Sequence, residues 1–162
     1  MLRLSEAASL VGGVMEGVDV EFKAVTSDSR KVQAGDLFVA LQGPRFDGNA
    51  YAQQAIAAGA VAALVSNPLE NSPHIVVVDT RAALGQLAAQ WRQRLPVRVV
   101  GVTGSNGKTT VKEMTAAILG EVGPTLATQG NLNNDIGVPL TLLALRQDHR
   151  YAVVEMGANR PG

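Results

Sequence analysis

Short apolar runs alternate with longer amphipathic stretches along this chain. The runs have the length and the β-branched content of strands, whereas apolar residues recurring every three or four positions are typical of helices. Strand–helix alternation of this kind predicts an α/β fold with a largely parallel sheet. Strands are expected at 18–25, 36–41, 61–65, 75–78, 97–102, 125–127 and 151–155, and helices at 5–10, 49–59, 80–94, 108–120 and from about 139.

Capping and breaking residues mark the ends of these predicted elements. Ser5 is expected to cap the first helix and Thr80 the long central one, because each side chain can accept a hydrogen bond from a free backbone N–H. Pro96 ends the long helix, and the pattern restarts after it. We therefore predict two domains, at residues 1–80 and 81–162.

Composition narrows the function classes. The chain has 162 residues, of which 46% are hydrophobic and 17% charged, so it has enough apolar material for a core. It contains no cysteine, which excludes disulfide scaffolds, thiolate metal sites and cysteine nucleophiles. Its two histidines, His74 and His149, are too few for a histidine metal site, and their polar flanks predict that both are solvated.

The charge balance argues against polyanionic partners. The 14 basic and 14 acidic residues cancel, so no whole-surface field attracts nucleic acid or an anionic membrane. No apolar run approaches the roughly 18 residues that cross a bilayer, and the start lacks a signal-peptide core. We expect a soluble, cytoplasmic monomer without nucleic-acid or membrane partners. Residues 1–81 carry a net charge of −3 and 82–162 one of +3, which fits either a random partition or an anion site in the second half.

The clearest chemical signal is the segment GVTGSNGKTT, which follows a predicted strand and opens a predicted helix. A phosphate loop needs this context, because glycines such as Gly104 and Gly107 let backbone N–H groups surround a phosphate at the positive end of the helix. Lys108 can reach the β- and γ-phosphates, and the Thr109 hydroxyl can ligate Mg²⁺. Val102 stands where the strict pattern has its first glycine, but the Gly-Lys-Thr end is intact.

The expected fold class is a small mixed-sheet α/β amino-terminal domain followed by the start of a P-loop NTPase-like parallel-sheet domain, and the loop defines the second of these. From Val97 onward only three strands and two helices are predicted, and the chain stops soon after strand 151–155. A parallel sheet of that size leaves its edges and faces uncovered. We therefore expect the second domain to be truncated, so that the chain is a fragment or is completed by a partner.

Glu155 closes the apolar strand YAVVE at the end of the sheet where α/β proteins place their ligands. Beside a phosphate loop, its carboxylate can hold Mg²⁺ directly or through water. Without such a neighbour, a glutamate at the end of a strand would simply be solvated.

Two further polar segments each allow two interpretations. The loop NLNND gathers Asn131, Asn133, Asn134 and Asp135, which could bind sugar hydroxyls, phosphate or a metal-bound water, or form a turn-rich connector. The segment TSDSR, at 26–30, could hold a diphosphate or a base edge through its serine, aspartate and arginine side chains. It could equally be a capped turn with a surface arginine.

Taken together, these segments resemble the Mur ligases, the ATP-dependent amide-forming enzymes of peptidoglycan precursor synthesis. TSDSRKVQAGDLFVALQGPRFDG is similar to their uridine-nucleotide-binding amino-terminal domain. TGSNGKTTVKEM, GNLNNDIGVPLTLL and VVEMGANRPG are together most similar to the member that adds D-alanyl-D-alanine. The order of the four segments makes the resemblance specific.

The resemblance implies a three-domain enzyme well over twice this length. The chain would match its UDP-binding domain and the opening part of its ATP-binding domain, with the carboxy-terminal ligase domain absent. ATP and Mg²⁺ are the implied cofactors, and UDP-N-acetylmuramoyl-tripeptide and D-alanyl-D-alanine the implied substrates. ATP would phosphorylate the terminal carboxylate of the tripeptide, and the dipeptide amine would attack the acyl phosphate. We expect the chain alone to be inactive.

The resemblance also implies roles for individual residues. Lys108 would neutralise charge on the transferred phosphoryl group, and it and Glu155 are the catalytic candidates. Thr109 and Glu155 would address Mg²⁺, and Asn134 and Asp135 would lie near the nucleotide and the metal. Contacts to the ATP phosphates are implied for Gly104, Ser105, Asn106, Gly107, Lys108, Thr109 and Thr110, and a UDP site for Ser27, Asp28, Ser29 and Arg30.

Two alternatives stay open. A sister Mur ligase, which adds the third amino acid, shares segments of the TSDSR and GDLFVAL type, although the loop NLNNDIGVP argues against it. A small nucleotide-binding module without ligase chemistry would suit the short length.

Overall fold

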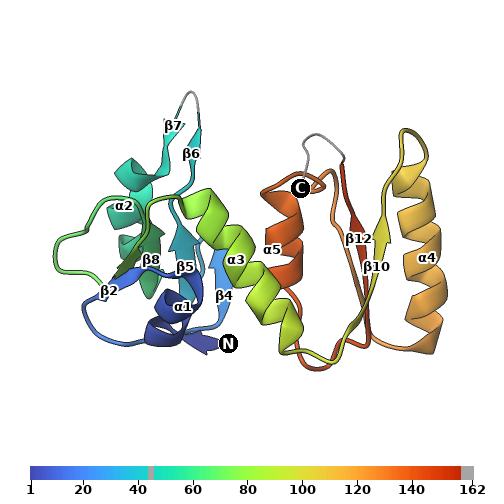
Figure 1. Cartoon of the computed structure of the whole chain (residues 1–162), viewed down its shortest axis with the longest axis horizontal. Coiled ribbons are helices and arrows are strands. Elements are labelled where there is room, and N and C mark those ends of the chain that lie inside the picture. The colour runs from blue at the N-terminus through green and yellow to red at the C-terminus, as the bar shows by residue number, and fades with distance from the viewer. Residues whose placement is uncertain (44–45, 158–162) are drawn as a thin grey trace. The chain divides into compact units, whose positions relative to one another are not determined.

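In the computed structural model, which describes residues 1–43 and 46–157, the chain forms two units, Met1–Leu87 and Ala88–Gly162 (Figure 1). The boundary lies inside helix α3 (Thr80–Gln93), beyond the break at 80/81 that the sequence suggests. Helix α3 buries residues along its whole length, and near its end the Trp91 ring nitrogen donates a hydrogen bond to the Leu145 carbonyl of the second unit (3.0 Å). The helix therefore contributes side chains to both cores.

The first unit is built on a mixed five-stranded sheet, as the sequence predicts. Four strands are parallel, and β2 joins the edge antiparallel to β9. Every residue of the central strands β5 and β8 is buried, which explains why all of β8 and all of β5 except Asp36 are apolar. The order is β2 (Val14–Glu16), β9 (His74–Val76), β8 (Ala62–Val65), β5 (Asp36–Val39) and β4 (Ala24–Thr26).

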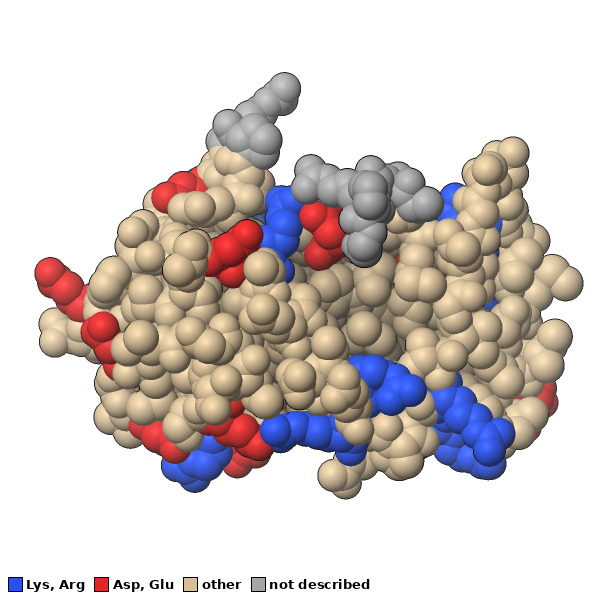
Figure 2. All heavy atoms as spheres, viewed as in Figure 1, with Lys and Arg blue, Asp and Glu red and all other residues tan. Residues whose placement is uncertain are grey.

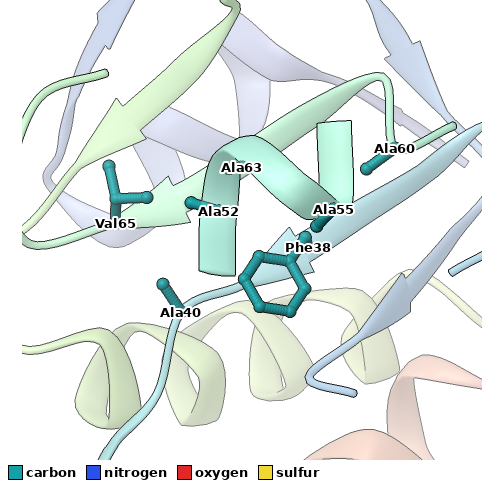
Figure 3. Close-up of a cluster of buried hydrophobic side chains, with 7 residues drawn as sticks. All are labelled: Phe38, Ala40, Ala52, Ala55, Ala60, Ala63 and Val65. Atoms are coloured by element: carbon teal, nitrogen blue, oxygen red, sulfur yellow. The ribbon is translucent and has the colours of Figure 1, made fainter. Parts of the chain in front are cut away.

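Small side chains allow helix α2 (Ala52–Ala57) to lie close to this sheet. Ala52 and Ala55 are fully buried against β5 and β8, and Phe38 fills the space beside them (Figure 3). The predicted helix at 49–59 is thus shorter, and it is preceded by the 3₁₀ turn η1 (Gly48–Tyr51).

The single strand predicted at 18–25 is wrong. It divides into β3 (Glu21–Phe22), which pairs antiparallel with β1 (Leu2–Arg3), and β4, which runs parallel to β5. The chain changes partner at Lys23, whose N–H donates to the Gly35 carbonyl (2.8 Å). An apolar alternation pattern does not reveal such a change of partner.

The predicted loop at 43–48 is only partly described, because Pro44 and Arg45 lie outside the described residues. On either side of them, β6 (Gln42–Gly43) and β7 (Phe46–Asp47) pair antiparallel. The segment 158–162, which includes the end of VVEMGANRPG, also lies outside the described residues.

Both predicted helix caps are wrong by one or two positions. Helix α1 (Leu4–Val11) starts before Ser5, whose N–H donates to the Asp19 carboxylate (2.9 Å). Helix α3 is capped by Asp79, which accepts from the N–H groups of Arg81 (2.8 Å) and Ala82 (3.0 Å). The Thr80 hydroxyl instead donates to a core carbonyl. Adjacent polar residues can compete for a cap, and tertiary contacts decide between them.

His74 is buried, so the prediction that it is solvated is wrong. Only 1% of the residue is exposed, and Nδ1 lies 2.8 Å from the Ser72 carbonyl while Nε2 accepts from the Leu69 N–H (3.2 Å). His149 is partly buried and accepts from the Arg146 N–H through Nδ1 (2.9 Å). The prediction rested on polar neighbours in the sequence. It could not show that nearby backbone groups form hydrogen bonds with the nitrogen atoms of both imidazole rings.

The second unit contains a parallel three-stranded sheet with the order β10 (Arg98–Val102), β12 (Tyr151–Glu155) and β11 (Thr125–Ala127). Helices α4 (Lys108–Val122) and α5 (Gly137–Leu143) connect these strands. The register places Val102 opposite Glu155, so the loop after β10 begins beside the end of β12. Parallel pairing thus brings the two strongest candidate segments to one end of the sheet.

The surface carries no dominant charge on the face drawn in Figure 2, where blue and red patches both occur among uncharged residues. Among the helices of the described residues, none is both long enough and apolar enough to cross a membrane.

Candidate functional site

The loop between β10 and α4 has the backbone conformation that a phosphate loop requires. Gly104 has φ +142° and Gly107 has φ +74°, both in the region that favours glycine. A Cβ atom at either position would meet no atom within 4 Å, so conformation rather than crowding requires glycine here. No side chain caps the start of α4 at Gly107. The first N–H groups of this helix are therefore available to an anion.

The Lys108 ammonium folds back over this loop. Its Nζ atom donates to the Gly104 carbonyl (2.7 Å), which holds the positive charge beside the loop backbone. Ser105, Asn106 and Thr110 are exposed around it. The structure thus gathers the whole predicted ATP-phosphate segment, residues 104–110, around one open, positively charged loop.

Glu155 lies at the end of β12, next to this loop, and only 2% of it is exposed. Asn133 Nδ2 donates to Oε1 (2.9 Å), and the Thr109 hydroxyl donates to Oε2 (3.1 Å). The Asn133 hydrogen bond is the largest cause that lowers the pKa of Glu155; burial opposes it, and Thr109 supports it. The nearby ammonium groups of Lys112 and Lys108 lower that pKa further. The carboxylate is thus kept ionised at neutral pH.

The oxygen atoms at this end of the sheet fit Mg²⁺. A carboxylate from Glu155 and a hydroxyl from Thr109 are hard ligands, and Mg²⁺ commonly binds one or two such groups together with substrate phosphates and water. Within the described part of the chain, no cluster of three or more His, Cys, Asp or Glu side chains could hold a metal by itself. Glu155 and Thr109 are therefore suited to a metal ion that binds together with the nucleotide phosphates.

The structure also places here a residue that the sequence did not single out. Thr128, directly after β11, accepts from the Glu155 N–H through its hydroxyl (2.9 Å). Asn133, a candidate from the NLNND loop, donates to the carboxylate itself. Asn134 instead accepts from the N–H groups of Ile136 and Gly137 and so starts α5, while Asp135 is exposed. Thr128 reaches Glu155 through the parallel register of β11 and β12, for which the sequence held no signal.

The predicted UDP segment lines a separate pocket in the first unit, with a volume of about 530 Å³. The Arg30 guanidinium donates two hydrogen bonds to the Asp28 carboxylate in a bidentate arrangement. They run from Nε to Oδ1 and from Nη2 to Oδ2, each at 2.9 Å. This contact is the main cause that lowers the pKa of Asp28 to about 2. The pocket is lined by Ser27, Asp28, Ser29, Arg30, Phe38, Leu41, Phe46, Gly48, Tyr51 and Gln54.

This lining combines two kinds of chemistry. Phe46 and Tyr51 provide aromatic surface on which a flat ring can stack, whereas the serine hydroxyls and the arginine provide hydrogen bonds for polar or anionic groups. Neither Phe46 nor Tyr51 is predicted from the sequence. Their position in the turn-rich stretch that follows the GDLFVAL segment was the available signal.

A strand, a glycine-containing loop and a helix, with an acidic side chain on the neighbouring strand, define a nucleotide-binding α/β protein of the P-loop type. Comparison with known families makes this specific. Residues 21–92 match the Mur ligase family catalytic domain, and residues 102–162 match the Mur ligase middle domain. The chain belongs to the Mur ligase family, which confirms the resemblance noted in the sequence.

Individual relatives agree with this assignment. The UDP-N-acetylmuramoyl-tripeptide–D-alanyl-D-alanine ligase of Escherichia coli K12 is 56% identical over 160 residues, covering 98% of this chain and 35% of the relative. The solved UDP-N-acetylmuramoylalanyl-D-glutamyl-2,6-diaminopimelate–D-alanyl-D-alanyl ligase of Acinetobacter baumannii is 44% identical, with a TM-score of 0.89 over 98% of this chain and 37% of that one.

The MurF ligase of Thermotoga maritima, solved in complex with ADP, is 36% identical with a TM-score of 0.77. The match covers 86% of this chain and 33% of that one. The chain therefore spans about a third of the length of the relatives it matches.

Proposed function

We propose that this chain supplies the UDP-binding and ATP-binding parts of an ATP-dependent ligase that joins D-alanyl-D-alanine to UDP-N-acetylmuramoyl-tripeptide. The observation that carries the proposal is the hydrogen bond from the Thr109 hydroxyl to the Glu155 carboxylate. It lies beside the glycine-containing loop, where Lys108 donates to the Gly104 carbonyl. The relatives in E. coli and A. baumannii are D-alanyl-D-alanine ligases by name, which supports this choice of substrates over those of the sister ligase.

The residues of the second unit would act on the phosphates of ATP. The backbone N–H groups from Gly104 to Thr110 would bind the phosphate oxygens, and Lys108 would balance the negative charge on the transferred group. Glu155 and Thr109 would hold Mg²⁺, which supplies electrostatic stabilisation to the phosphates when it is bound. Asn134 and Asp135 stay predictions for this region.

The first unit would hold the nucleotide end of the other substrate. Phe46 and Tyr51 would contact the uracil ring, and the serines with Arg30 would bind the ribose or diphosphate.

The terminal carboxylate of the tripeptide takes the γ-phosphoryl group and ADP leaves. The amine of D-alanyl-D-alanine then attacks the acyl carbon, and phosphate leaves as the amide forms. We propose that this chemistry is cytoplasmic and needs one polypeptide.

Isothermal titration of the chain tests both sites. We expect ATP with Mg²⁺ and UDP each to bind at one site, and neither to displace the other because they use different units. ATP binding without any UDP binding would favour a nucleotide-binding module and contradict the ligase assignment. Loss of UDP binding on Tyr51→Ala, with ATP binding unchanged, would locate the uridine site. Gln53→Ala, outside the pocket lining, is the matched control in η1–α2.

A further inference from the structure

Lys112 is a buried lysine that the proposed mechanism does not use. Only 1% of the residue is exposed, although lysine is almost never fully buried without a partner. It lies on α4 three residues after Thr109 and four after Lys108, and this spacing puts it on the same face of the helix, one turn further on. A buried ammonium requires a reason, because a neutral side chain would avoid the loss of hydration.

The contacts of Lys112 lead directly to the backbone that carries Glu155. Nζ donates to the Thr128 carbonyl (2.8 Å) and pairs with the carboxylate of the exposed Glu113 (2.9 Å). Thr128 is fixed on its other side by the bond from its N–H to the Val153 carbonyl (3.0 Å). Its hydroxyl accepts from the Glu155 N–H (2.9 Å), so Lys112 and Glu155 are joined through one residue.

Glu155 is therefore held in place in two independent ways, through its carboxylate and through its backbone. Thr109 and Asn133 orient its carboxylate, whereas Lys112 acts through Thr128 on its backbone. Methionine would fill nearly the same buried volume as lysine without a charge, and replacing a buried charge by a well-packed apolar group is often neutral for stability. Packing alone therefore does not account for an ammonium at this place.

We propose that Lys112 is a positioning residue, which through Thr128 holds Glu155 in place for the metal that accompanies the nucleotide. The proposal rests on the proposed ATP–Mg²⁺ function of the loop. Lys112 itself would touch neither nucleotide nor metal. Its removal should therefore affect the contribution of Mg²⁺ to nucleotide binding and leave the contribution of the loop intact.

The test compares ATP binding with Mg²⁺ and with EDTA, by titration calorimetry, in the wild-type chain and in Lys112→Met. We expect the tightening of ATP binding by Mg²⁺ to fall about tenfold in the variant, as is usual when a partner of a metal ligand is lost. Binding in EDTA and the melting temperature should stay close to wild type. Glu113→Gln, which removes only the exposed partner of Lys112, is the control and should keep the full effect of Mg²⁺.

A second variant covers the case in which Lys112→Met does not fold. Thr128→Val keeps the shape of the side chain but removes the hydroxyl that accepts from Glu155, so it should show the same selective loss. An undiminished effect of Mg²⁺ in either folded variant would overturn the proposal. Absence of ATP binding in the wild-type chain would instead contradict the proposed function itself, so the two failures are distinguishable.

Discussion

Lys108 and the loop glycines would bind an anion by different means. The glycines contribute conformation, because Gly104 and Gly107 turn the backbone N–H groups toward an open space, whereas Lys108 contributes charge. Only the charge can be removed without altering the path of the chain. Lys108 donates to a single carbonyl of the loop, so its loss should leave the fold intact.

Lys108→Met is therefore expected to weaken ATP binding strongly and to leave the melting temperature unchanged. Hydrogen bonds to a charged group contribute about 1.5–3 kcal/mol, which corresponds to a loss of affinity of roughly 10- to 150-fold. Titration calorimetry measures the effect, and Lys31→Met, an exposed lysine in the other unit, is the matched control. Wild-type affinity in Lys108→Met would show that the loop does not bind the phosphates.

The sequence indicated the residues of this loop better than the residues around it. A phosphate loop is contiguous, so GSNGKTT could be recognised from its own spacing. Thr128 and Lys112 reach the site only because β11 lies against β12 and because α4 turns one face toward the sheet. Such contacts depend on strand register, which the sequence alone did not provide.

At the scale of elements, the strands that match the predictions are short and bounded by strong turn signals. The predicted bounds 125–127 and 151–155 are confirmed. These bounds were predictable because a proline or polar residues precede each apolar run. The segment 18–25 failed because its two halves pair with different strands, and the two caps failed because Asp79 and Asp19 take the roles assigned to Thr80 and Ser5.

Asp19 ties the start of α1 to the segment before β3. It accepts from the N–H and the hydroxyl of Ser5 (2.9 and 3.0 Å) and from Nε of Arg3 (2.8 Å). The Arg3 side chain is the largest cause that lowers the pKa of Asp19 to about 2. A lowered folded-state pKa means that the stabilisation is present above the unfolded pKa of about 3.9 and is lost as the pH falls toward 2.

Asp19→Asn should therefore lower the melting temperature at pH 7, and the difference from wild type should shrink as the pH falls from about 4 to about 2. Thermal unfolding followed by circular dichroism across this range measures it. Glu121→Gln, at an exposed position of α4, is the control for the loss of one carboxylate. A difference that is constant from pH 7 to 2 would mean that the charge of Asp19 does not stabilise α1.

At the scale of the whole molecule, the two proposed sites lie in different units, and each is built from described residues of its own unit. The first unit contains the pocket lined by Ser27 to Arg30, and the second contains the loop from Gly104 to Thr110. The sequence alone can propose both segments, because the residues of each proposed site lie in a short run. The ligase reaction requires both substrates, so its test needs a protein of the relatives' length.

A chimera provides that test. Residues 1–162 would replace the matching third of the E. coli ligase, to which they are 56% identical. We expect phosphate release that requires both UDP-N-acetylmuramoyl-tripeptide and D-alanyl-D-alanine, and its loss in the Lys108→Ala chimera, because the loop would no longer balance the charge of the transferred phosphoryl group. The 162-residue chain alone is the negative control.

Two results would contradict the assignment in different ways. Phosphate release that is indifferent to D-alanyl-D-alanine would reject the second substrate, and release supported by the UDP-dipeptide with a single amino acid would point to the sister ligase. Undiminished amide formation in the Lys108→Ala chimera would reject the role of the loop, because the remaining two thirds of the chimera would then carry the chemistry without it. Since both chimeras share those two thirds, any difference between them arises from Lys108 itself.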